Sequence, residues 1–282
     1  MFRAMRFEVL GPVRGWLGES ELDLGSPQQR AVLAMLLLAR GRQVPLGVII
    51  DGLWEGDMPR SAVGTVRTYV SRLRSLLSAG AAATAGCVII SAGDGYALHL
   101  GPALLDLDQF EGWLSDARGA WQRHEEAQAA ALLRSALGLW QGAALAGIPG
   151  PYAESRRVRL SELQLAAEQE RLAMDIEAGE HVAAIAELRA LLADHPFREG
   201  FSESLMLALY KAGRQADALT VYDSVRRGLR DELGVDPGPA LQGMYQRILR
   251  ADDELMDVAD KHVVRMPGMR PRGRIVGEPI VA

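Results

Sequence analysis

The stretch RSAVGTVRTYVSRLRSLL, from Arg60 to Leu77, decides the fold class of the N-terminal part of this chain. It carries four arginines, and no acidic residue occurs between Asp57 and Asp94, although the whole protein has a formal net charge of -5. At about 100° per residue, the segment predicts a helix with one apolar arc and one polar arc. The apolar arc contains Ala62, Val66, Tyr69, Val70, Leu73, Leu76 and Leu77.

The polar arc has the composition of a DNA-reading helix. An arginine can donate two hydrogen bonds to O6 and N7 of guanine, and serine or threonine hydroxyls can contact bases or phosphates. The alternative is a solvated surface helix, but such helices usually interleave acids with their bases to form i,i+4 pairs. We therefore predict that this helix enters the major groove. The candidate DNA contacts on or beside the polar arc are Arg60, Thr65, Arg67, Thr68, Ser71, Arg72 and Arg74.

The segments around this helix predict a winged helix-turn-helix. Two short strands joined by a turn-rich segment come first, followed by two helices, the arginine-rich helix and a hairpin that turns at Gly93-Asp94-Gly95. Ser26 as N-cap and Pro27 at the first helical position mark the start of the first helix. In a winged domain the third helix lies in the groove and the hairpin lies over the backbone. The expected elements are strands Phe7–Leu10, Glu21–Leu24, Val88–Ser91 and Tyr96–Leu100, and helices Gln28–Arg40, Val44–Leu53 and Arg60–Leu77.

The pattern changes from Leu105 onward to a series of amphipathic helices separated by short Gly- or Pro-containing breaks. Two of the units resemble each other, with small residues at helix-crossing points, aromatics and a short turn, which is typical of tetratricopeptide-like helical hairpins. We expect three parts: a winged helix-turn-helix domain at 1–102, an all-α helical-repeat domain at 103–250, and a disordered Pro- and Gly-rich tail at 251–282. The expected helices are Asp106–Trp121, Glu125–Trp140, Tyr152–Gly179, His181–Ala193, Arg198–Ala212, Gln215–Leu233 and Pro239–Arg250.

Composition excludes several classes of protein. No apolar run approaches the roughly 18 residues that a membrane span needs, and the N-terminus lacks a signal-peptide pattern. The single cysteine, Cys87, excludes an intrachain disulfide framework. The five histidines are scattered without metal-ligand spacing, and no nucleophile motif occurs. We therefore expect a cytoplasmic, nucleoid-associated protein that is not an enzyme, needs no cofactor and contacts no membrane.

Longer motifs carry a family resemblance. SPQQRAVLAMLLLARGRQV, the segment IIDGLWEGDMPRSAVGTVRTYVSRLRSLL and the hairpin GDGYAL resemble the DNA-binding domain of the streptomycete antibiotic regulatory protein family. The second half, including LDLDQFEGWL, ALLRSALGLWQGAAL and DELGVDPGPALQGMYQRIL, resembles the bacterial transcriptional activation domain of that family. The resemblance runs unbroken from about Phe7 to Arg250. Because no G-x-x-x-x-G-K-[ST] phosphate loop occurs, the chain resembles the small members of the family.

The resemblance implies roles for particular residues. Thr68, Arg72 and Arg74 match the family's recognition helix as base or phosphate contacts, and Arg67 stands where members vary, which suggests a specificity residue. Arg30 could clamp a phosphate or form a surface salt bridge. Gly93 and Gly95 match the wing, where they permit the turn, and Tyr96 would pack there.

The resemblance also implies partners and a mechanism. Two copies would bind direct repeats in double-stranded DNA about one helical turn apart. The helical domain would then contact the neighbouring copy and RNA polymerase subunits to activate an antibiotic biosynthetic cluster. A repressor with the same DNA-binding module is the main alternative, because the sign of regulation depends on where the operator lies. A non-catalytic helical scaffold would leave the acid-free arginine helix unexplained.

Overall fold

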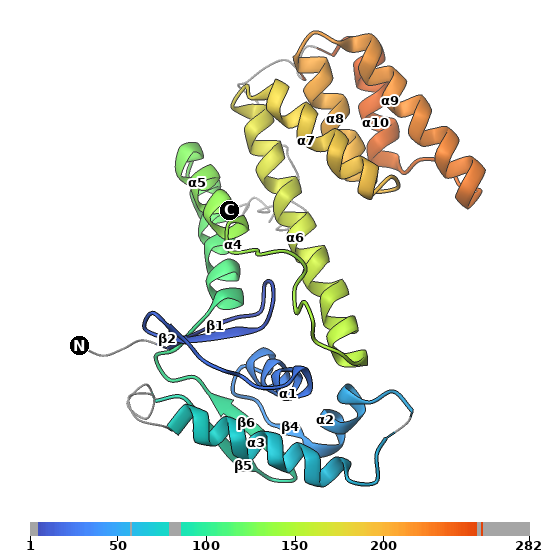
Figure 1. Ribbon diagram of the computed structural model, residues 1–282. Coiled ribbons are helices and arrows are strands. Elements are labelled where there is room, and N and C mark those ends of the chain that lie inside the picture. The colour runs from blue at the N-terminus through green and yellow to red at the C-terminus, as the bar shows by residue number, and fades with distance from the viewer. Residues whose placement is uncertain (1–4, 57, 79–85, 253–254, 256–282) are drawn as a thin grey trace, which may run out of the picture. The chain divides into compact units, whose positions relative to one another are not determined.

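The computed structural model describes residues 5–56, 58–78, 86–252 and 255 (Figure 1). The chain forms two compact units, Met1–Ala167 and Glu168–Ala282, and the boundary between them falls within helix α6 (Pro151–Glu177). Most of the predicted disordered tail at 251–282 lies outside the described residues.

The first unit begins with a small mixed sheet of strand order β3-β2-β1-β7. Strand β1 (Met5–Glu8) pairs antiparallel with β2 (Arg14–Leu17), and β2 pairs antiparallel with β3 (Ser20–Glu21). Strand β7 (Leu104–Leu105) pairs parallel with β1, so the chain returns to this sheet after the winged domain.

The predicted strand Glu21–Leu24 overlaps an observed strand only at Glu21, because β2 and the start of β3 lie earlier, within the segment expected to be turn-rich. The misleading residue is Gly15, which looks like a turn residue in the sequence. It lies opposite Phe7 in the strand pairing, where an added Cβ would meet the phenyl ring at 3.1 Å. The glycine therefore makes room for a buried aromatic ring within a strand.

Three helices and a three-stranded sheet follow, and they confirm the winged helix-turn-helix. The sheet has the order β4-β6-β5, and β5 and β6 form the predicted hairpin across Gly93-Asp94. Ser26 caps the first helix, since its side chain accepts a hydrogen bond from the backbone N–H of Gln29 at 3.3 Å. The elements are α1 (Pro27–Leu38), β4 (Val44–Pro45), α2 (Leu46–Leu53), α3 (Ala62–Ser78), β5 (Val88–Ala92) and β6 (Gly95–His99) (Figure 1).

The arginine-rich helix begins two residues later than predicted. Pro59, Arg60 and Ser61 form a turn in which the backbone N–H of Ala62 donates to the carbonyl of Pro59 at 2.9 Å. Arg60 is exposed on this turn and is not part of α3. Proline disfavours the helical conformation for the residue before it, so Pro59 disfavours an extension of the helix back to Met58.

The remaining helices match the predicted positions within a few residues. In the first unit, α4 (Asp106–Gln122) packs against α5 (Glu126–Leu137). In the second unit, α8 (Glu199–Lys211) packs against α7 (His181–Asp194), α9 (Gln215–Gly228) and α10 (Pro239–Leu249). The predicted single helix Gln215–Leu233 is divided, since its last turn is a π-helix, η2 (Leu229–Leu233), that ends at left-handed Gly234.

The helices that follow the winged domain are anchored to the N-terminal sheet. The carbonyls of Leu10 and Val9 accept hydrogen bonds from the backbone N–H groups of Gln141 (2.8 Å) and Leu145 (3.0 Å). Asp106, the first residue of α4, accepts hydrogen bonds from the backbone N–H groups of Val9 and Leu10 at 2.8 to 3.0 Å. The DNA-binding module and the start of the helical domain therefore belong to one packed unit.

Asp106 is buried, and burial raises the pKa of its carboxyl to about 6 by disfavouring the charged form. The hydrogen bonds from Leu10, Val9 and Leu107 offset this in part by favouring the carboxylate, while Glu8 raises the pKa further. Because the folded pKa lies above the ordinary value of 3.8, the folded state binds more protons than the unfolded chain between about pH 4 and 6. The contribution of Asp106 to stability therefore increases as the pH falls through 6.

Asp106→Asn is expected to lower the free energy of unfolding at pH 7 by about 1–3 kcal/mol, because the amide nitrogen cannot accept a hydrogen bond from a backbone N–H, whereas both oxygens of a carboxyl can, whether it is ionised or protonated. The variant should also lose the pH dependence that Asp106 contributes between about pH 4 and 6. Urea unfolding at several pH values would measure both effects. Asp108→Asn is the matched control, since Asp108 is exposed and its pair with Arg40 is expected to contribute less than about 1 kcal/mol. An unchanged pH dependence in Asp106→Asn would contradict this role.

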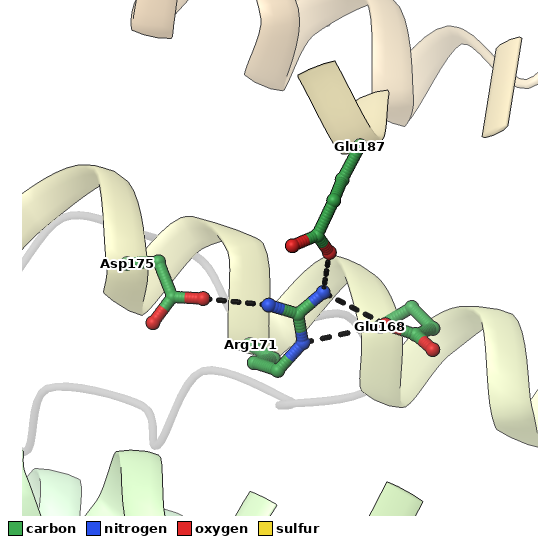
Figure 2. Close-up of polar contacts among 4 residues, drawn as sticks. All are labelled: Glu168, Arg171, Asp175 and Glu187. Atoms are coloured by element: carbon green, nitrogen blue, oxygen red, sulfur yellow. Dashed lines mark hydrogen bonds and ion pairs between the residues drawn. The ribbon is translucent and has the colours of Figure 1, made fainter. Parts of the chain in front are cut away.

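The second unit contains a cluster of three carboxylates around one arginine (Figure 2). Arg171 of α6 donates to Asp175 at 2.7 Å and to Glu168 at 3.1 Å, both within the same helix. It also donates to Glu187, which ties α6 to α7. The side chains of Arg171 and Asp175 are only 12% and 14% exposed, so this pair is largely withdrawn from solvent, whereas the side chain of Glu187 is 50% exposed.

Candidate nucleic-acid interface

Helix α3 has one buried face and one exposed polar face. The residues that are buried recur at three- and four-residue intervals, so they form one stripe along the helix. Tyr69, Leu76 and Arg74 are half-buried at the sides of that stripe. The buried residues are Ala62, Val66, Val70, Leu73 and Leu77, and the exposed polar residues are Arg67, Thr68, Ser71, Arg72, Ser75 and Ser78.

The exposed face offers two unengaged guanidinium groups. Within the described part of the chain, neither Arg67 nor Arg72 makes a hydrogen bond or an ion pair. The hydroxyl of Thr68 donates to the carbonyl of Gly64 at 2.9 Å, which leaves its oxygen lone pairs free to accept. Because α3 contains no acidic residue, nothing within the helix neutralises this face.

Arg74 is engaged within the protein. Its Nε donates to the carbonyl of Ile89 at 2.9 Å and its Nη2 donates to the hydroxyl of Ser91 at 2.9 Å, both on β5. Its guanidinium also lies 5.5 Å from the ring centre of Tyr96 on β6. The sequence shows only a third arginine on the polar side of α3, and nothing in its spacing reveals these contacts.

The opposite side of α3 is held by α1. The phenol of Tyr69 donates to Oε1 of Gln28 at 2.8 Å. The spacing of Tyr69 in the sequence puts it on the apolar arc, and nothing in that spacing reveals this bond. The half-buried position of the tyrosine explains the pattern, since its ring packs while its hydroxyl finds a polar partner.

The two glycines of the predicted wing differ in role. Gly95 is buried, and a Cβ there would lie 2.1 Å from the carbonyl oxygen of Val44, so this residue allows β4 and β6 to approach. We therefore assign Gly95 to packing. Gly93 is exposed at the tip with a φ of 53°, which permits the turn. The adjacent Asp94 is held by Gln43, whose Nε2 donates to the carboxylate at 2.8 Å.

Arg30, Arg60 and Thr65 lie away from the exposed centre of α3. Arg30 is half-buried on α1, and its buried Nε has no hydrogen-bond partner among the described residues. The structure therefore shows no salt bridge for Arg30 in the described ranges. Arg60 lies on the turn before α3, and Thr65 is half-buried in its first turns.

Comparison with known proteins matches both halves of the chain. Residues 19–98 match the family described as transcriptional regulatory protein, C terminal, and residues 105–249 match the bacterial transcriptional activator domain. Regulatory protein AfsR of Streptomyces griseus is 46% identical over 95% of this chain and 27% of its own length. Regulatory protein DnrI of Streptomyces peucetius is 32% identical over 88% of this chain and 93% of its own length.

A solved structure, Mycobacterium tuberculosis EmbR in complex with a low-affinity phosphopeptide, is similar with a TM-score of 0.81 and 34% identity. The similarity covers 88% of this chain and 65% of that one. The chain spans about a quarter of the length of the AfsR relatives it matches.

The winged helix and the helical domain after it define a DNA-binding transcriptional regulator of the activator class. The relatives are named as regulatory proteins, AfsR and DnrI, or as a transcriptional regulatory protein, EmbR. The chain belongs to the streptomycete antibiotic regulatory protein family of transcriptional activators, which confirms the family inferred from its motifs. Among the described residues, no helix has the length and apolar character that crossing a membrane requires.

Proposed function

We propose that this protein binds direct repeats in promoter DNA and recruits RNA polymerase to activate an antibiotic biosynthetic cluster. The observation that carries the proposal is the acid-free exposed face of α3, on which Arg67 and Arg72 have no partner in the described ranges. An exposed guanidinium without an internal partner is free to donate two hydrogen bonds to a guanine edge.

We assign the contacts by position. Arg67 and Arg72 read bases, with Arg67 as the residue that distinguishes this protein's operator. Thr68 and Ser71 lie on the same exposed face and contact bases or phosphates. The flanking groups contact the DNA backbone, which fixes orientation without reading sequence. This backbone set comprises Arg30, whose Nε lacks a partner, together with Arg60, Thr65 and the exposed tip at Gly93.

The proposed assembly follows from groove geometry. Successive major grooves on one face of B-DNA lie about 10–11 base pairs apart, so two copies on direct repeats place their α3 helices in neighbouring grooves. We assign DNA binding to residues 1–102 and contacts with the neighbouring copy and RNA polymerase to residues 103–250. The names of the Streptomyces relatives, regulatory protein AfsR and regulatory protein DnrI, support a regulatory role. The choice of an antibiotic cluster as the target rests on membership of the streptomycete antibiotic regulatory protein family.

DNase I footprinting on the promoters beside the protein's own gene, combined with transcription by purified polymerase, tests this function. We expect two protected sites one helical turn apart, upstream of the start site, and more transcript in the presence of the protein. A site that overlaps the start, with less transcript, would show a repressor. Protection without sequence preference would contradict the proposal as a whole.

A further inference from the structure

The exposed face of α3 is bordered by one polar contact on each side. On a helical wheel of about 100° per residue, Tyr69 and Arg74 stand at the two borders between the buried stripe and the exposed arc. Tyr69 is bonded to Gln28 of α1, and Arg74 is bonded to Ile89 and Ser91 of β5. The exposed polar residues Arg67, Thr68, Ser71, Arg72, Ser75 and Ser78 all fall between these borders.

The buried stripe sets which face of α3 points toward the core, but its contacts define the rotation of the helix about its axis less strictly than directional bonds do. Its members are aliphatic, and apolar contacts are not directional. Hydrogen bonds are directional and weaken steeply as their angle degrades. Bonds to α1 on one side and to the hairpin on the other therefore oppose rotation of α3 in either direction.

Arg74 suits this task better than it suits a base contact. Its Nε and Nη2 both donate to β5 at 2.9 Å, and its guanidinium also lies over the ring of Tyr96. Breaking these contacts to reach DNA would give up two hydrogen bonds and a cation–π contact, which offsets what a new contact could contribute.

We propose that Arg74 and Tyr69 are positioning residues that fix the rotation of α3, so that Arg67 and Arg72 point at base edges. This inference rests on the proposed function, because it assigns how that DNA interface is oriented. Base readout needs side chains within hydrogen-bond geometry, whereas phosphate attraction tolerates small rotations. Loss of positioning should therefore reduce sequence preference more than general DNA affinity.

The test compares two DNA duplexes in the full chain. The first is a duplex that the wild-type protein selects from a random-sequence pool, and the second is a scrambled duplex of equal composition. We expect Arg74→Met to bind the selected duplex at least about tenfold more weakly, which corresponds to the loss of one base contact. Its affinity for the scrambled duplex should be unchanged. Ser91→Ala should give part of that loss and add nothing in the Arg74→Met background, since both changes remove the same contact.

Other outcomes would overturn the inference. One such outcome is an equal loss of affinity for both duplexes, together with a salt dependence of the binding constant that corresponds to about one fewer released counterion. That result would mean that Arg74 contacts a phosphate directly. Additive effects of Arg74→Met and Ser91→Ala would show that the two residues act separately. If Arg74→Met does not fold, Tyr69→Phe removes only a hydroxyl and should show the same selective loss; an unchanged preference would contradict the proposal. If the wild-type protein selects no common sequence from the random pool, the proposed function itself would be refuted.

Discussion

Replacing Arg67 and Arg72 together with alanine is expected to abolish recognition of the operator while leaving the fold intact. Each lost base contact should cost about 1–3 kcal/mol, so the pair should weaken binding at least about 30-fold. Both side chains are exposed and have no partner among the described residues, so thermal stability should change by less than about 0.5 kcal/mol. Gel shift or fluorescence anisotropy on the footprinted promoter would measure the affinity.

The control must remove the same charge elsewhere. Arg189→Ala with Arg226→Ala removes two exposed arginines from α7 and α9 of the second unit. This variant should bind the operator as the wild type does. If it loses as much affinity as the α3 variant, general charge rather than α3 would carry DNA binding. If the α3 variant binds unchanged, the assignment of α3 as the reading helix would be wrong.

The second large effect is expected at Arg171 in the helical domain. Arg171→Met leaves Glu168, Asp175 and Glu187 close together without their shared cation (Figure 2). Asp175 is only 14% exposed, so its charge cannot be fully resolvated. Removing one partner of a buried ion pair typically costs about 3–5 kcal/mol, and we expect a loss of that order for the second unit.

Chemical denaturation of the full chain, followed by a probe in the second unit, would measure the Arg171→Met effect. Arg230→Met is the matched control: its pair with Asp236 is 59% exposed on both sides, and less than about 1 kcal/mol is expected. A loss at Arg171 no larger than at Arg230 would show that the cluster contributes little.

The sequence predicts the helices well because their signals are local. The buried stripe of α3 follows the 3.6-residue period, and Ser26 with Pro27 marks the start of α1 correctly. The predictions failed where a long-range contact decides the structure. Gly15 looks like a turn residue until Phe7 is placed opposite it in the sheet.

The exposed polar residues of α3 were predictable as a set, but the contacts that each side chain makes were not. Composition shows that α3 lacks acids, which is sufficient to identify the polar face. It does not show that Arg74 is bonded to β5, because that contact spans 15 residues and depends on how the hairpin packs. The role of Asp106 was missed for the same reason, since its partners Val9 and Leu10 lie 97 and 96 residues earlier in the chain.

Methylation interference on the protein's promoter tests the central claim most directly. Methylation of guanine N7 blocks a major-groove acceptor, whereas methylation of adenine N3 blocks the minor groove. We predict interference at guanines in two sites spaced about 10–11 base pairs apart. In the Arg67→Ala and Arg72→Ala variants, interference should disappear at the guanines that the missing arginine contacts. Interference confined to adenine N3, or guanine interference unchanged in both variants, would contradict major-groove reading by α3.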